Sequence, residues 1–158
     1  MHGSLNRTAL SATLHCLTGC AIGEVLGMVI GTALGWGNAA TIAISVVLAF
    51  FFGYSLTMAP LLRAGLAFGA AAPLALASDT LSIGVMELVD NTVMLLVPGA
   101  LDAGLRDLLF WGSLAFSLVV AFWVAFPVNR WLIARGKGHA VVHAYHGHGD
   151  HAQHEHAH

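Results

Sequence analysis

The sequence predicts an all-α integral membrane protein, a bundle of about four transmembrane helices followed by a disordered, histidine-rich C-terminal tail. Three observations predict this fold class. Of the 158 residues, 58% are hydrophobic and only 9% are charged, whereas soluble domains carry charge at roughly a quarter of their positions. Long runs without charge recur, and about 20 apolar residues are needed to cross a bilayer core. The last segment, in contrast, is mostly polar.

The first two spans are predicted at residues 12–35 and 40–62. The first ends at a Gly-Trp-Gly-Asn sequence, because clustered glycine and asparagine favour a turn. The second ends where Pro60 and Arg63 interrupt the apolar run.

The third hydrophobic region, residues 64–97, is too long for one simple span. Two interpretations are open. Either a short lead-in at 64–77 precedes a span at 78–98, or one tilted helix is kinked near Pro73.

The fourth span is predicted at residues 108–133, so that residues 1–134 form the transmembrane domain. Residues 135–158 form the polar tail, whose composition is typical of disorder.

Basic residues indicate the orientation, because loops rich in lysine and arginine stay in the cytoplasm. Only Arg106 falls on one side of the predicted bundle. The others fall together on the opposite side: Arg7, Arg63, Arg130, Arg135 and Lys137. We therefore expect a multi-pass protein of the cytoplasmic membrane with both termini in the cytoplasm.

Glycines recur at every fourth position of the first span: Gly19, Gly23, Gly27, Gly31 and Gly35. This spacing produces a groove in which another helix can approach closely. The partner helix is either in the same chain or in a second copy, in which case the groove would form a homo-oligomer.

A second series with the same spacing contains Cys16, Cys20, Glu24 and Met28, and His15 precedes it on the glycine stripe. Sulfur and imidazole are ligands for soft or borderline metal ions, and carboxylate adds charge. Neighbouring members lie one turn, about 6 Å, apart. Glu24 falls near mid-span, where a charged side chain costs at least about 2.5 kcal/mol. The first span thus predicts partial metal sites that another helix completes.

The third span carries matching groups. The predicted ligands from both spans are His15, Cys16, Cys20, Glu24, Asp79, Met86, Glu87 and Asp90. Since the first and third spans run in the same direction, we expect Glu87 and Asp90 near the depth of Glu24. Asp79 is expected nearer the two cysteines.

The same groups have a structural interpretation. Cysteine and methionine often serve only as packing residues. Buried acids that face each other either share protons or bind a cation, because like charges repel strongly when unscreened. Both interpretations remain open at the level of the sequence.

The tail contains eight of the ten histidines, and such a composition is typical of metal binding. They are His139, His143, His146, His148, His151, His154, His156 and His158. The tract also contains acidic residues and is not a plain run of six histidines. We expect it to collect metal ions for the membrane domain.

Two segments carry a resemblance to a known family. They are His15-Cys16-Leu17-Thr18-Gly19-Cys20-Ala21-Ile22-Gly23-Glu24 and Met86-Glu87-Leu88-Val89-Asp90-Asn91. Over roughly residues 10–133 the chain resembles a prokaryotic family of small membrane proteins catalogued as a domain of unknown function. The resemblance implies a polytopic membrane protein and supplies no mechanism.

These observations favour binding and translocation of a transition-metal ion, with copper and zinc the expected ions. We expect no enzymatic activity, and the net charge of −2 favours no nucleic-acid partner. A membrane redox or metal-maturation subunit is one alternative, although the two cysteines lack the Cys-x-x-Cys spacing of exchange enzymes. A scaffold subunit is the other alternative.

Overall fold

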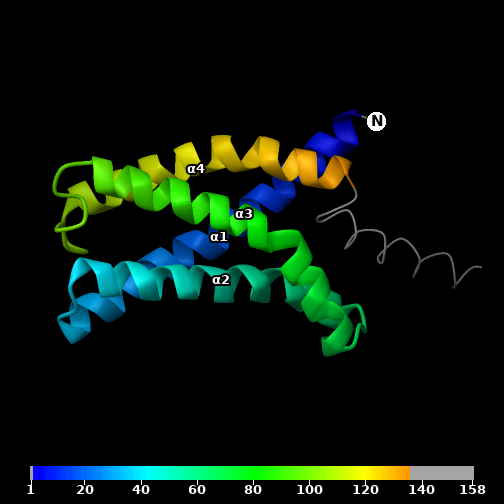
Figure 1. Ribbon diagram of the computed structural model, residues 1–158, viewed down its shortest axis with the longest axis horizontal. Coiled ribbons are helices and arrows are strands. Elements are labelled where there is room, and N and C mark those ends of the chain that lie inside the picture. Colours follow the sequence, from blue (N-terminus) through cyan, green and yellow to red (C-terminus); the bar gives the residue numbers. More distant parts are fainter. Residues whose placement is uncertain (1, 136–158) are drawn as a thin grey trace, which may run out of the picture.

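The computed structural model describes residues 2–135 as four α-helices joined by short connections (Figure 1). The helices are α1 (His2–Leu34), α2 (Asn38–Arg63), α3 (Phe68–Leu96) and α4 (Leu108–Ala134). Residues 2–135 contain no strand. The predicted all-α fold class is therefore confirmed. The eight tail histidines lie outside the described residues.

The helices are long and apolar enough for a multi-pass membrane protein. Three stretches satisfy this criterion individually: Gly3–Leu34, Asn38–Arg63 and Leu108–Ala134. The two arms of α3 satisfy it together, which gives up to four spans by length and composition. Many large apolar side chains are also exposed, for example Leu88 at 70% and Trp123 at 69%. Such a surface suits contact with lipid.

Residues 64–77 divide into a turn and the first arm of α3. The turn contains Gly65, whose φ of +90° favours glycine over residues with a side chain. A bend of 45° separates Phe68–Ala77 from Asp79–Leu96. Pro73 lies in the first arm and the Thr80 hydroxyl donates to the Leu76 carbonyl at 2.5 Å. Both a proline and this type of hydroxyl bond bend helices.

The first helix starts ten residues earlier than the predicted span. Its N-terminal part packs on the end of α4, where Ala9 and Ala12 contact Ile133. Asn129 of α4 also donates a hydrogen bond to the Thr13 hydroxyl at 2.9 Å. At 1.5 Å per residue the whole of α1 is about 50 Å long, so it exceeds the thickness of a bilayer core.

The glycine groove of α1 is filled by α2 of the same chain. A Cβ atom added at Gly19 would lie 2.8 Å from the backbone of Gly53. The next three glycines meet α2 in the same way: Gly23 at Ala49, Gly27 at Ser45 and Gly31 at Thr41. A homo-oligomer would therefore need another surface, because these four positions leave no room for a second copy.

The fifth glycine of the stripe has a different function. Gly35 has a φ of +66° and follows directly after the last residue of α1. Glycine is the residue that most readily adopts this conformation at a helix end. Gly35 thus ends the helix and does not extend the groove.

Contacts between the helices place α1 and α3 on a diagonal of the bundle. Each helix contacts its neighbours in the order α1, α2, α3, α4 and back to α1, and α1 also contacts α3 directly. The N-terminus and the end of α4 lie at one end of the bundle, which we call the terminal end (Figure 1). The α1–α2 and α3–α4 connections lie at the other, which we call the loop end.

Candidate functional site

Four carboxylates are buried between α1 and α3, and three of them form one group nearer the loop end. Glu24 of α1 is 8% exposed, and Glu87 and Asp90 of α3 are 4% and 1% exposed. They come together because α1 and α3 run in the same direction along the central diagonal, with these residues in the halves nearer the loop end. The predicted match in depth between the two helices is therefore seen in the structure.

The side chains of the two helices meet in successive pairs. Glu24 lies beside Asp90, and Cys20 lies beside Glu87. One further turn towards the terminal end, Cys16 lies near Asp79 and Ser82. We call the six residues Cys16, Cys20, Glu24, Asp79, Glu87 and Asp90 the polar column. Along α1 the column extends from Cys16 to Glu24, a rise of about 12 Å.

Hydrogen bonds satisfy only part of the carboxylate oxygens. Ser117 of α4 donates to Asp90 Oδ1. The Asn91 amide nitrogen lies 2.8 Å from the Glu87 carbonyl and 3.5 Å from Glu87 Oε2. Three oxygens accept no hydrogen bond from a described donor if all three acids are ionised: Glu24 Oε1, Glu87 Oε1 and Asp90 Oδ2. Glu24 and Asp90 are also close enough to hydrogen-bond each other, which requires a proton on one of them, and the Cys20 thiol bonds Glu87. Buried polar atoms are normally paired, so these oxygens are the notable feature of the site.

Within residues 2–135, no lysine or arginine balances the three acids inside the bundle. The arginines of residues 2–135 are all exposed: Arg7, Arg63, Arg106, Arg130 and Arg135. Carboxylates buried without an opposite charge are strongly disfavoured. The site therefore requires a bound proton or a cation from outside the chain.

The two cysteines are free thiols in the packed centre of the bundle. Cys16 is 2% exposed and Cys20 is 1% exposed. Met86 is fully buried in the same cluster, together with Ile83 of α3. Three sulfur atoms thus lie on the terminal side of the carboxylates, among apolar neighbours.

His15 is positioned differently from the other predicted ligands. Its Nε2 atom lies 2.9 Å from the Leu56 carbonyl oxygen of α2, and a carbonyl can only accept, so Nε2 is the donor. The imidazole thus has at least one contact on α2. A backbone contact of this kind is the structural alternative for a histidine near a helix end.

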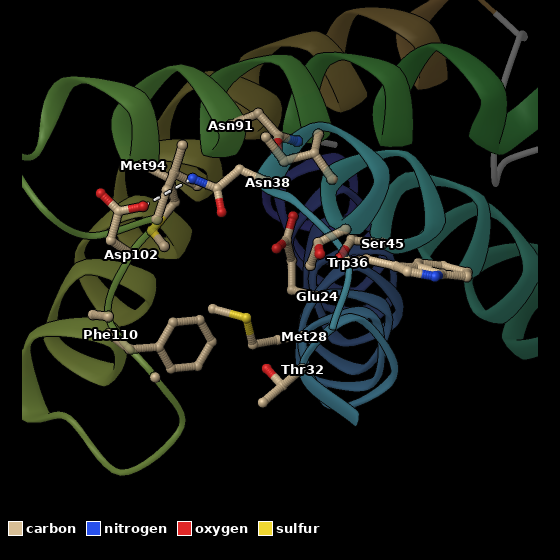
Figure 2. A pocket seen from close by; sticks show the side chains of 15 residues that line it. Glu24, Met28, Thr32, Trp36, Asn38, Ser45, Asn91, Met94, Asp102 and Phe110 are labelled. Atoms are coloured by element: carbon tan, nitrogen blue, oxygen red, sulfur yellow. Dashed lines mark hydrogen bonds between the residues drawn. The ribbon is translucent and has the colours of Figure 1, made fainter. Parts of the chain in front are cut away.

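A pocket of about 300 Å³ opens next to the carboxylates at the loop end. Glu24 lines it, and Figure 2 shows the Glu24 carboxylate among the labelled side chains of the pocket. Exposed residues at its edge include Trp36, Asn38 and Asp102. Asn38 donates to Asp102 Oδ1 at 3.0 Å and so connects the start of α2 to the α3–α4 connection.

Comparison with known proteins identifies the family. Residues 5–138 match the family described as a domain of unknown function, DUF4396. The chain belongs to this family. No curated protein and no solved structure matches the DUF4396 chain. The match covers the predicted range of 10–133 and reaches only the beginning of the tail.

The predicted ligands within the described helices do not form a closed metal centre. Within residues 2–135, no group of three or more histidine, cysteine, aspartate or glutamate residues is arranged to bind a metal ion. The predicted ligands meet in pairs from two helices instead. A metal ion held by two protein ligands keeps open coordination positions. This distinguishes the arrangement from a structural site, in which four protein ligands surround the ion.

Sequence reasoning missed the contribution of α4. Ser117 contacts Asp90, and a pattern in the sequence of α4 indicates which side of that helix faces the acids. Small or polar residues recur at every fourth position of an otherwise apolar helix, and all are buried: Ser113, Ser117, Ala121, Ala125 and Asn129. This stripe marks the side of α4 that faces the polar column.

Proposed function

We propose that this DUF4396 protein binds a transition-metal ion of the copper or zinc class and translocates it across the cytoplasmic membrane. The observation that carries the proposal is the group Glu24, Glu87 and Asp90. These acids are buried and come from two helices, and each has an oxygen without a described donor when all three are ionised. A proton shared between Glu24 and Asp90, or a bound cation, would satisfy them. Ionisable residues within membrane spans usually belong to substrate or ion pathways.

Charge neutralisation explains why a cation would enter. Each carboxylate buried without a counter-charge raises the energy of the bundle, and a bound cation or proton removes that penalty. The Cys20 thiol beside Glu87 adds a sulfur ligand one turn further along. Thiolate favours copper(I) and zinc over magnesium or calcium.

Ligands arranged in pairs favour transport of a metal ion over its storage. A conducting site must bind its ion strongly enough to admit it and weakly enough to release it. Successive pairs one turn apart provide several moderate positions and no closed cage. The ion would move between the carboxylates and the thiols along the α1–α3 diagonal.

The proposed orientation places both termini in the cytoplasm. The exposed basic residues Arg7, Arg63 and Arg130 lie at the terminal end, in agreement with the positive-inside rule. The histidine tail would then exchange metal ions with the cytoplasmic mouth of the column. The sequence contains no nucleotide-binding motif, so an ion gradient or a partner protein would drive transport.

Metal uptake into proteoliposomes tests the proposal. The full chain, with its eight tail histidines replaced by alanine, is reconstituted with a metal-sensitive dye inside, and copper(I) or zinc is added outside. Glu24→Gln and Cys20→Ser should each lower the initial uptake rate by about tenfold or more, by analogy with the 10–100-fold effects of changing groups around metal sites. Vesicles with the parent chain should take up metal clearly faster than protein-free vesicles.

Thr92→Val is the matched control. The Thr92 hydroxyl is exposed and donates to the Leu88 carbonyl of its own helix at 2.6 Å, so uptake should stay at the parent level. Equal uptake by the parent, Glu24→Gln and Cys20→Ser would contradict transport through the column. Normal growth of the Glu24→Gln strain in metal excess and metal starvation would favour the scaffold alternative.

A further inference from the structure

The pocket at the loop end has the chemistry of a cation site. Its charged lining residues are Glu24 and Asp102, both acidic. No lysine or arginine of residues 2–135 lines it. Amide and hydroxyl groups supply further oxygen atoms, for example Asn91 and Thr32. An anion would therefore meet only repulsion here, whereas a cation meets opposite charge at the mouth and at the floor.

Two methionines extend the polar column into this pocket. Met28 follows Glu24 by one turn of α1, and Met94 follows Asp90 by one turn of α3. Both line the pocket, and both belong to one packed cluster with Phe110. Figure 2 shows Met28, Met94 and Glu24 around the same space. Their thioether sulfurs are soft ligands.

Glu24 connects this space to the buried acids. Its side chain is 92% buried and lines the pocket, and its Oε1 atom accepts no hydrogen bond from a described donor although the carboxyl group is hydrogen-bonded to Asp90. On its other side lies Asp90. A cation in the pocket would thus contact the first carboxylate of the column before it reached the rest.

We propose that this pocket is the entry site for a soft, thioether-binding cation such as copper(I), with Met28, Met94 and Glu24 as ligands. This inference rests on the proposed function and adds the substrate class and the side of loading. Carboxylate and thiol ligands alone suit zinc as well as copper(I), but thioethers favour copper(I). Loading would occur from the loop end, opposite the termini.

The size of the pocket agrees with a partly hydrated ion. A volume of about 300 Å³ corresponds to roughly ten water molecules at about 30 Å³ each. An ion can therefore enter with water and exchange some of it for the two sulfur atoms and the Glu24 oxygen.

Silver(I) binding tests the entry site, because silver(I) has the charge and ligand preference of copper(I) and is not readily oxidised. The full chain, with the tail histidines replaced by alanine and with Cys16 and Cys20 replaced by serine so that no thiol competes for silver(I), is placed in nanodiscs and titrated with silver(I) and separately with zinc. In the double variant Met28→Leu/Met94→Leu, silver(I) affinity should fall by about tenfold or more, while zinc affinity changes less than twofold. Leucine has nearly the volume of methionine, so the cluster should keep its packing.

Met58→Leu is the matched control, since Met58 packs on the Leu61 cluster of α2 and does not line the pocket. Its silver(I) affinity should equal that of the parent. Parent-level silver(I) binding in the Met28→Leu/Met94→Leu variant would overturn the entry site. An equal fall for silver(I) and zinc would also overturn it, because it would indicate a general loss of structure.

The two proposals fail separately. If Glu24→Gln and Cys20→Ser abolish metal uptake while the methionine variant binds silver(I) normally, transport through the column stands and the entry site is wrong. If the methionine variant loses silver(I) binding while Glu24→Gln and Cys20→Ser show parent-level uptake, the two methionines bind the soft cation and the proposal of transport through the column is wrong.

Discussion

The contact between Ser117 and Asp90 shows how one hydroxyl group can stabilise a buried acid by donating a hydrogen bond to it. Asp90 Oδ2 has no hydrogen-bond partner within the described residues, so the Ser117 donor at Oδ1 is important for this carboxyl group. It also connects α4 to the diagonal of α1 and α3.

Replacing Ser117 with alanine should therefore destabilise the bundle. A buried acceptor that loses its partner costs about 1–3 kcal/mol, so Ser117→Ala should unfold at a lower temperature than the parent in detergent. Ser113→Ala is the comparison, because Ser113 is buried one turn earlier in α4 and donates no described hydrogen bond to Asp90. Equal melting temperatures for the Ser117→Ala variant and the parent would argue against a structural role of this contact.

The two thiols provide a second residue-scale prediction. Cys16 and Cys20 are almost completely buried, so a hydrophilic maleimide should label each single-cysteine variant far more slowly in native membranes than after unfolding in sodium dodecyl sulfate. The measurement is the labelling time course of Cys20→Ser and of Cys16→Ser. Rapid labelling of either native variant would contradict the packing described for the centre of the bundle.

At the scale of elements, the glycine stripe determines how closely α1 and α2 approach. At Gly23 an added Cβ atom would collide with the backbone of Ala49. Backbone atoms cannot move aside as the end of a flexible side chain can, so the two helices would have to separate.

Gly23→Ala should accordingly lower the stability of the bundle by about 1–3 kcal/mol, the usual effect of overpacking. Gly112→Ala in α4 is the matched control, because a Cβ atom there meets nothing within 4 Å and alanine favours the helix. Thermal unfolding in detergent measures both. A Gly23→Ala variant as stable as Gly112→Ala would show that the α1–α2 contact is looser than described.

At the scale of the whole molecule, the topology makes a prediction about sidedness. Gly37 lies in the α1–α2 connection at the loop end, and Ala67 lies just before α3 at the terminal end. In a chain without Cys16 and Cys20, an impermeant maleimide added outside intact cells should label Gly37→Cys and spare Ala67→Cys. Labelling of both from outside would contradict the proposed orientation.

The sequence predicted the fold class because hydrophobic length alone identifies membrane helices. It also predicted which side chains of α1 would face the acids of α3, since four-residue spacing places Cys20 and Glu24 on one side of α1. It could not predict that α2 would fill the glycine groove, because a groove accepts any close partner. A kink near Pro73 was one of the two interpretations of residues 64–97, and α3 does bend by 45° after Ala77. The spacing of apolar residues alone could not choose between the two interpretations.

The polar residues of α4 were harder to recognise. A serine within a membrane helix usually bonds its own backbone, and Ser117 also lies 2.8 Å from the Leu114 carbonyl. Only the packing of α4 against α3 places Ser117 beside Asp90. Position in the bundle, and not residue type, distinguishes Ser117 from the exposed Thr92.

The burial of Glu24 beneath the pocket has an electrical consequence. A charge that crosses the whole membrane changes its energy by about 2.3 kcal/mol per 100 mV. An ion that reaches Glu24 from the loop end crosses part of that potential difference, so its occupancy must depend on membrane voltage. If the loop end faces outwards, an inside-negative potential increases occupancy; if it faces inwards, the same potential decreases it. The sign of this dependence therefore reports the direction in which the protein is inserted.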